Sequence, residues 1–181
     1  MQILSGTEVA SLVKERVQAE CAQFIARTAV VPCLAVVLVG NDSASESYVA
    51  SKRTACTEMG FRHVDYLLEA STTQAELLSV IASLNTDPAV HGILVQFPLP
   101  SHIDEQKVMK AIAFEKDVDG LHPTNLGNIV IGKPGLVPCT PAGVLRMLDH
   151  YGIDTCGMHA VIVGRSTIVG KPLAVLLMQK G

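Results

Sequence analysis

Leu34-Ala-Val-Val-Leu-Val39 is an uninterrupted run of apolar and β-branched side chains. A strand with one face in water alternates apolar and polar residues, whereas a strand covered on both faces does not. The run therefore predicts a buried strand, which follows Pro32 and ends at Gly40. No apolar run in the sequence approaches the roughly 20 residues that cross a bilayer, so no membrane-spanning segment is expected.

Helices and strands alternate on both sides of this strand. Before it, apolar positions from Val9 to Ile25 recur at helical spacing, with Thr7 as the N-cap. After it we expect, in order, a helix Ser43–Met59 closed by Gly60, a strand His63–Leu68, a helix 73–85 and a strand His91–Gln96. Strands that alternate with helices pair in parallel and carry helices on both faces. The sequence thus predicts an α/β fold with an N-terminal three-layer αβα domain of parallel strands.

The rest of the sequence predicts the start of a second domain. We expect a helix from Asp104 to Phe114, then a glycine- and proline-rich connection 115–140 with a short strand pair near Ile129. A helix capped by Thr140 and ending near Tyr151, a strand Ala160–Val163, a turn Gly164–Gly170 and a helix Lys171–Lys180 follow. The expected domains are residues 1–139 and 140–181. A single strand, turn and helix cannot close a doubly wound sheet, so we expect the chain to stop inside the second domain.

Composition narrows the class of protein. The 181 residues are 49% hydrophobic, which excludes a disordered chain, and 14 basic against 17 acidic side chains form no basic cluster for nucleic acid. The five cysteines lack C-x-x-C spacing, which indicates reduced thiols and a cytoplasmic protein. The first residues lack a basic segment followed by an apolar one, so no secretory signal is expected.

Polar residues that follow apolar strands are the first candidates for a site, because ligands of α/β sheets bind beyond the carboxyl ends of the strands. Tyr48 and Lys52 stand four positions apart on a predicted helix and therefore share one face. Gln96 is the polar end of the third apolar run, and Asp117 and Asp119 lie in a glycine-closed turn. On spacing alone, the first pair also fits an ordinary exposed surface and the aspartates a capped turn.

Gly164-Arg-Ser-Thr-Ile-Val-Gly170-Lys-Pro172 follows an apolar run and opens a predicted helix. A phosphate-binding P-loop would need glycine in place of Arg165 and Ser or Thr in place of Pro172. Two interpretations remain: a variant dinucleotide-binding turn, in which Gly164 and Gly170 let the backbone approach pyrophosphate, or a structural turn. In the first, Arg165 suits a 2'-phosphate and favours NADP over NAD.

Two other kinds of site lack the necessary spacing. The six histidines form no H-E-x-x-H pattern, and a calcium loop fails because Leu126 stands where the bidentate glutamate is required. No G-x-S-x-G nucleophile elbow occurs. Neither a metal site nor a serine or cysteine nucleophile is expected.

Five ordered motifs resemble the bifunctional methylenetetrahydrofolate dehydrogenase/methenyltetrahydrofolate cyclohydrolase family. They are Tyr48-Val-Ala-Ser-Lys52, Gly92-Ile-Leu-Val-Gln-Phe-Pro-Leu-Pro100, Lys116-Asp-Val-Asp-Gly120, Pro138-Cys-Thr-Pro141 and the Gly164–Pro172 turn. The resemblance covers the whole chain, with Phe97 where leucine is usual and Phe114 where proline is common. Family members continue through the rest of a Rossmann domain, which agrees with a chain that stops inside it.

The resemblance implies an NADP-dependent oxidation of 5,10-methylenetetrahydrofolate to the methenyl form, followed by hydrolysis to 10-formyltetrahydrofolate. It makes Lys52 the general acid/base, Tyr48 a residue that stacks on or orients the folate, and Gln96 the hydrogen-bond partner of Lys52. Asp119 would bind the pterin ring. Gly164, Arg165, Ser166 and Gly170 would bind the cofactor.

The resemblance also implies a homodimer in the full-length protein and a folate substrate. A second hypothesis keeps the same fold without the catalysis: a non-catalytic α/β fragment that binds a ligand or a partner subunit. In that case the shared motifs would reflect the parent enzyme rather than an activity of these 181 residues.

Overall fold

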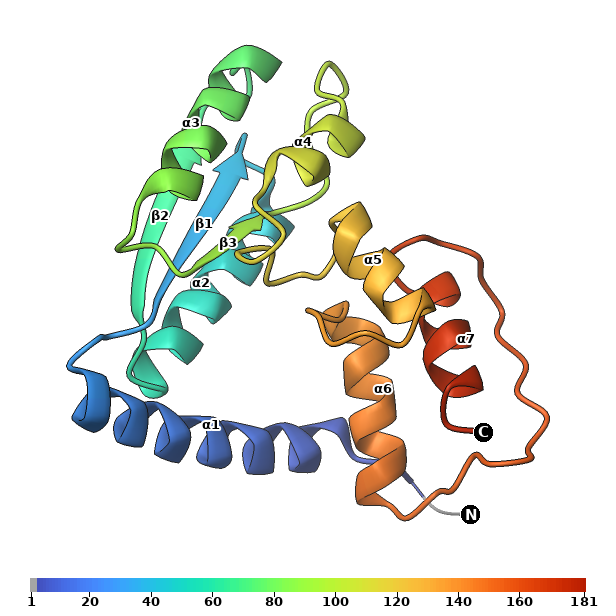
Figure 1. Ribbon diagram of the computed structural model, residues 1–181. Helices are drawn as coiled ribbons and strands as arrows, with labels where there is room; N and C mark the ends of the chain where they lie inside the picture. The colour runs from blue at the N-terminus through green and yellow to red at the C-terminus, as the bar shows by residue number, and fades with distance from the viewer. Residues whose placement is uncertain (1–2) are drawn as a thin grey trace. The chain divides into compact units, whose positions relative to one another are not determined.

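The computed structural model describes residues 3–181, apart from the side chains of Ser43 and Ala44. In chain order the elements are α1 (Gly6–Thr28), β1 (Cys33–Val39), α2 (Ser43–Glu58), β2 (Arg62–Leu68), α3 (Gln74–Thr86), β3 (Gly92–Val95), α4 (Glu105–Ala111), α5 (Pro123–Val130), α6 (Cys139–His150) and α7 (Gly170–Met178) (Figure 1). The chain divides into two compact units, one formed by Lys14–Asp117 and the other by the N-terminal residues to Val13 with Val118–Gly181.

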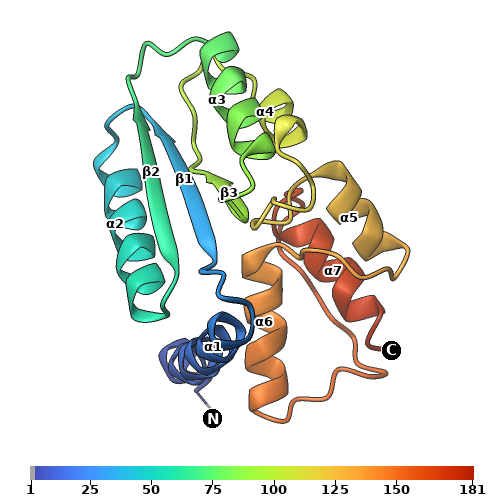
Figure 2. The same cartoon turned by 60° about the vertical axis from the view of Figure 1, so that its left-hand side comes forward.

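The unit Lys14–Asp117 is built on a parallel sheet with strand order β2-β1-β3. The central strand β1 is buried along nearly its whole length, and Ala35, Val36 and Val37 are completely inaccessible to water. Helix α2 covers one face of the sheet and α3 the other (Figure 2). On the α3 side, Leu77 and Ile81 belong to a core cluster that continues into β1, β3 and α4. The predicted α/β class and parallel pairing are confirmed.

Local chemistry explains where these helices begin and end. Asp42 caps α2 by accepting a hydrogen bond from the Ser45 amide at 2.8 Å, and this bond lowers the pKa of the Asp42 carboxyl. Gly60, at φ 78°, ends the α2 segment as expected. Thr73 and Glu76 form a capping box at the start of α3.

The predicted N-caps of two other helices are wrong. Thr7 lies inside α1, which starts at Gly6, and the Ser5 hydroxyl accepts the bond from the Glu8 amide at 3.3 Å. Thr140 lies inside α6, which starts at Cys139 after Pro138. In both cases the helix begins before the predicted cap. At α6, Pro138 has the extended conformation of an N-cap, and at α1 the Ser5 hydroxyl supplies the acceptor.

Two segments predicted to form strands have another structure in the unit that contains Val118–Gly181. The segment near Ile129 is helix α5, which Pro123 starts at the first helical turn while the His122 ring accepts from the Thr124 amide. Ala160–Val163 forms no strand, and Val163 is 99% exposed. Within its described residues this unit has no strand with which that segment could pair, and a lone strand leaves its backbone groups unsatisfied.

No helix among residues 3–181 combines the length and the apolar character needed to cross a bilayer. The same residues contain no cluster of three His, Cys, Asp or Glu side chains that could hold a metal ion.

We expect the cysteines to react with iodoacetamide at very different rates. Cys56 is buried between α2 and the sheet, and burial raises the pKa of its thiol, so little thiolate forms at neutral pH. Cys156 is exposed. Timed alkylation read by peptide mass spectrometry should label Cys156 first and Cys56 only on unfolding; equal labelling of the folded protein would contradict this burial.

Candidate active site

The Lys52 side chain meets Gln96 beside the sheet. Lys52 Nζ donates a hydrogen bond of 2.9 Å to Gln96 Oε1, and both groups are partly buried. Gln96 directly follows β3, and Lys52 lies on the helix that follows β1. In a sheet of order β2-β1-β3, the connection after β1 leads to one side of β1 and the connection after β2 leads to the other side. The place between β1 and β3 is therefore a switch point of the strand order, where ligands of α/β sheets bind.

The Gln96 amide is held in one orientation. Its backbone N–H donates to Val37 O at 2.8 Å, and its side-chain Nε2 donates to Phe97 O at 2.7 Å. With Nε2 bound to a carbonyl, Oε1 is the atom presented to Lys52. Lys52 therefore has a neutral acceptor. A carboxylate at this position would stabilise the ammonium form much more strongly.

Tyr48 lies one turn before Lys52 on the same face of α2. Lys52 Nζ lies 5.6 Å from the centroid of the Tyr48 ring, a cation–π distance. The Tyr48 side chain is 62% exposed. An exposed aromatic ring beside an amine offers a flat surface on which a planar ligand can stack.

An ion pair fixes α2 against β2 next to this face. Arg53 Nε donates to Asp65 Oδ2 at 2.9 Å, and the guanidinium makes a second contact with the same oxygen. His63 Nε2 lies 2.8 Å from the other carboxylate oxygen of Asp65. Because Arg53 immediately follows Lys52, this contact restrains the rotation of the helix that carries Lys52.

The two aspartates of the Lys116–Gly120 motif have different surroundings. Asp117 belongs to the unit with the sheet, is 2% exposed and forms a bridge with Ile93. Asp119 belongs to the other unit, is half-buried and has its Oδ1 3.9 Å from the Cys139 thiol. Asp119 is thus the aspartate more accessible to a ligand.

The turn after Asp119 requires glycine. Gly120 has a φ of 65°, and a Cβ there would lie 2.7 Å from the main-chain carbon of Val137. Any side chain would force the backbone apart, so Gly120 fixes the course of the chain directly after Asp119.

The turn Gly164–Gly170 also has a tight geometry. A Cβ on Gly170 would lie 2.5 Å from Gly164 O, whereas nothing lies within 4 Å of the Cβ position at Gly164. Ser166 Oγ accepts from the amides of Val169 and Gly170, at 3.1 and 3.3 Å, and so orders the start of α7. Arg165 is exposed. Open space above Gly164, a helix start and an exposed guanidinium suit a phosphate group.

The structure therefore brings Tyr48, Lys52 and Gln96 together in one unit, whereas Asp119 and the Gly164–Gly170 turn belong to the other. Sequence reasoning did not anticipate the Phe97 carbonyl, because a main-chain acceptor leaves no trace in residue type.

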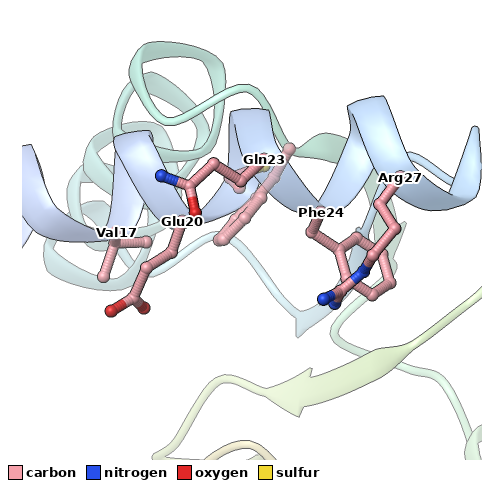
Figure 3. A pocket seen from close by; sticks show the side chains of 7 residues that line it. Val17, Glu20, Gln23, Phe24 and Arg27 are labelled. Atoms are coloured by element: carbon pink, nitrogen blue, oxygen red, sulfur yellow. The ribbon is translucent and has the colours of Figure 1, made fainter.

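A hollow of about 420 Å³ in the unit with the sheet lies elsewhere, along the second half of α1 (Figure 3). Its lining includes Phe24, Arg27 and Phe61 but neither Lys52 nor Gln96. It is a different place from the site at the end of β3.

The fold and site define a class: an α/β protein that presents an amine, a neutral amide and an exposed tyrosine ring at the switch point of a parallel sheet. The sequence model of the tetrahydrofolate dehydrogenase/cyclohydrolase catalytic domain matches residues 4–119, and that of the family's NAD(P)-binding domain matches residues 138–181. The chain belongs to the tetrahydrofolate dehydrogenase/cyclohydrolase family.

Individual relatives agree. The chain is 51% identical over 178 residues to the bifunctional protein FolD of Campylobacter hominis, covering 98% of this chain and 62% of that protein. The crystal structure of the bifunctional FolD methylenetetrahydrofolate dehydrogenase/cyclohydrolase from Campylobacter jejuni matches 100% of this chain and 64% of that one, with a TM-score of 0.97 and 45% identity. The Trypanosoma brucei enzyme, crystallised with NADP and an inhibitor, has a TM-score of 0.94 and 35% identity, covering 99% of this chain and 61% of that one.

Proposed function

We propose that this chain carries the folate site and the first part of the cofactor site of an NADP-dependent methylenetetrahydrofolate dehydrogenase and methenyltetrahydrofolate cyclohydrolase. The enzyme would oxidise 5,10-methylenetetrahydrofolate to the methenyl form and hydrolyse that to 10-formyltetrahydrofolate. The observation that carries the proposal is the Lys52–Gln96 hydrogen bond at the switch point of the sheet. Since the chain spans 62% of the length of the Campylobacter hominis relative, the proposal concerns the activity of the whole enzyme.

Lys52 is the proton-transfer group of the hydrolysis. Water adds to the methenyl carbon, and the proton that the water loses passes to the Lys52 amine. The carbinol oxygen then loses its remaining proton as the carbon–N5 bond breaks and the formyl C=O forms, while N5 takes up a proton from Lys52, so that one proton is released to solvent overall. A cationic methenyl substrate disfavours a neighbouring ammonium and so favours the free amine. Gln96 orients the amine without adding a negative charge that would oppose this effect.

Tyr48 and Asp119 bind the folate in this proposal. The exposed Tyr48 ring stacks on or orients the substrate, and the Asp119 carboxylate accepts hydrogen bonds from N–H groups of the pterin ring. Neither role needs a change of charge on these side chains. Both serve to position the one-carbon bridge beside Lys52.

Asp119→Asn should weaken folate binding more than NADP binding. A carboxylate makes charge-assisted hydrogen bonds with ring N–H groups, and an amide does not equal them. We expect a loss of about 1.5 to 3 kcal/mol in the free energy of folate binding. Calorimetric titration of the whole enzyme with each ligand measures this, with Asp154→Asn as a control on an exposed aspartate. Equal weakening of both ligands would count against a pterin contact.

The turn Gly164–Gly170 binds the cofactor phosphates. NADP, when bound, accepts the hydride from the folate methylene. Gly164 leaves room for a close backbone approach, Ser166 and Gly170 order the start of α7, and Arg165 supplies a guanidinium for the 2'-phosphate. Hydride transfer itself needs no protein acid, so the contribution of these residues is positioning.

We infer further that residues 1–139 form the catalytic domain and residues 140–181 the beginning of the NADP-binding domain. The whole enzyme would be a cytoplasmic homodimer that binds neither membranes nor nucleic acid. The buried, unpaired thiols of Cys21, Cys33 and Cys56 support a reducing compartment. The absence of a basic cluster in a chain of net charge -3 supports the statement on nucleic acid.

An extended enzyme tests the proposal: this chain joined after Gly181 to the C-terminal remainder of the Campylobacter hominis relative. We expect NADP reduction with 5,10-methylenetetrahydrofolate and, separately, disappearance of the methenyl absorbance. Introducing Lys52→Met into the extended enzyme separates the contribution of this chain from that of the Campylobacter hominis segment, because Lys52 lies in this chain. A folded extended enzyme that binds folate without either activity would favour a non-catalytic module instead.

A further inference from the structure

Lys116 lies outside the Lys52–Gln96 pair, on the segment that follows α4. It is a half-buried lysine whose Nζ donates two hydrogen bonds, to Leu84 O at 3.0 Å and to Asp87 O at 2.8 Å. Both carbonyls lie at the C-terminal end of α3, where main-chain oxygens lack partners within the helix. A cation is favoured at this end of a helix dipole. The Lys116 ammonium is therefore anchored on the last turn of α3.

Asn85, on the same turn, holds the chain just before Lys116. Its Nδ2 donates to Ala111 O at 2.7 Å, and its Oδ1 accepts from the Ala113 amide at 2.8 Å. Both ends of the amide are used. Two side-chain contacts thus fasten the segment Ala111–Lys116 to the end of α3.

The fastened segment supports the outer edge of β3. The Ile93 amide donates to Lys116 O at 2.7 Å, and Ile93 forms a parallel bridge with Asp117. The opposite edge of β3 pairs with β1, so in the part of the chain that the structure describes β3 is an edge strand with this segment beside it. β3 ends at Val95, and Gln96 follows.

We propose that Lys116 is a positioning residue of the folate site. Its anchored ammonium fixes the main-chain segment that supports the strand ending at Gln96 and that continues directly into Asp119. The inference rests on the proposed function, because it assigns Lys116 to the positioning of Gln96, and through it Lys52, for folate. Lys116 itself touches no reacting atom.

Three variants of the 181-residue chain test this inference by titration with tetrahydrofolate. Lys116→Met removes the donors at similar length, Lys116→Arg keeps a cation that can donate to two carbonyls, and Lys110→Met makes the same change at an exposed lysine of α4. We expect Lys116→Met to raise the dissociation constant about 10-fold or more, because small displacements of positioning groups have large effects. The dissociation constant of Lys116→Arg should lie within about 3-fold of the wild-type value, and that of Lys110→Met should equal the wild-type value.

A spectroscopic signal separates positioning from mere stability. In the ligand-free chain, the side-chain amide resonances of Gln96 should shift or broaden in Lys116→Met and return in Lys116→Arg. A purely structural role would lower the melting temperature and leave both the Gln96 resonances and the affinity of the folded protein unchanged. If Lys116→Met does not fold, Lys116→Gln, which keeps a neutral donor, must show the weakened binding at a wild-type fold.

The outcomes distinguish the two proposals. A wild-type chain that binds tetrahydrofolate, with a folded Lys116→Met or Lys116→Gln variant that binds it equally well, would overturn the role of Lys116 and leave the proposed function standing. A folded wild-type chain with no saturable tetrahydrofolate binding would overturn the proposed function, and this inference with it.

Discussion

Lys52→Met should abolish methenyl hydrolysis in the extended enzyme while the protein stays folded. Methionine has a similar length and fits a half-buried position on α2, but it can neither accept a proton nor donate to Gln96 Oε1. Loss of an acid/base group should slow hydrolysis about 100-fold or more. The rate is read from the loss of the methenyl absorbance, with circular dichroism to verify the fold.

Two further variants make this result specific. Lys52→Arg keeps the positive charge, but a guanidinium does not give up its proton near neutral pH, so this variant should be nearly as slow as Lys52→Met. Lys14→Met, at an exposed lysine paired with Glu58 at 3.3 Å, should hydrolyse at the wild-type rate. Near-normal hydrolysis by Lys52→Met would remove Lys52 from the chemistry.

The second large effect concerns the 181 residues by themselves, which should show no dehydrogenase activity. Within residues 138–181, which match the NAD(P)-binding domain, Ala160–Val163 forms no strand. Val161 is 76% exposed, so the segment that precedes the Gly164 turn has no sheet to hold it. A turn that no sheet holds in place cannot position the cofactor, so the hydride donor and acceptor are not held together.

The comparison is between this chain and the extended enzyme at equal concentration. We expect saturable NADP reduction with 5,10-methylenetetrahydrofolate only in the extended enzyme. A matched extended enzyme with Arg165→Met should keep folate binding and bind NADP more weakly, which would tie the recovered activity to this turn. Saturable NADP reduction by the 181 residues at the rate of the extended enzyme would show that these residues suffice.

The α/β unit could be predicted closely from the sequence because buried strands there are uninterrupted apolar runs and buried helix faces have apolar residues at helical spacing. The run Leu34–Val39 is central strand β1, and the helical spacing after it is α2, which Gly60 closes. These elements pack against one another within the unit Lys14–Asp117. Their apolar positions therefore report contacts that the structure contains.

The second unit was harder to predict for a physical reason. Ala160–Val163 has the composition of a buried strand. Such a composition favours a strand only where neighbouring strands and helices cover it. Near Ile129, apolar β-branched residues favour a strand, but Pro123 and the His122 cap start a helix that buries Ile129. Tertiary context decides both cases.

The candidate site could be predicted in part. The spacing of Tyr48 and Lys52 indicates one helix face, and their contact at 5.6 Å agrees. The partner of Lys52 came from family resemblance rather than from spacing. Main-chain carbonyls orient Gln96, through Phe97, and hold Lys116, at the end of α3. Because every residue has such a carbonyl, no residue pattern predicts these contacts.

Calorimetric titration of the folded 181-residue chain with tetrahydrofolate, and separately with NADP, tests the central claim most directly. We predict saturable binding of tetrahydrofolate, weakened by Asp119→Asn, together with no saturable binding of NADP. A folded chain that gives no saturable heat with tetrahydrofolate would contradict the assignment of Tyr48, Lys52, Gln96 and Asp119 to a folate site.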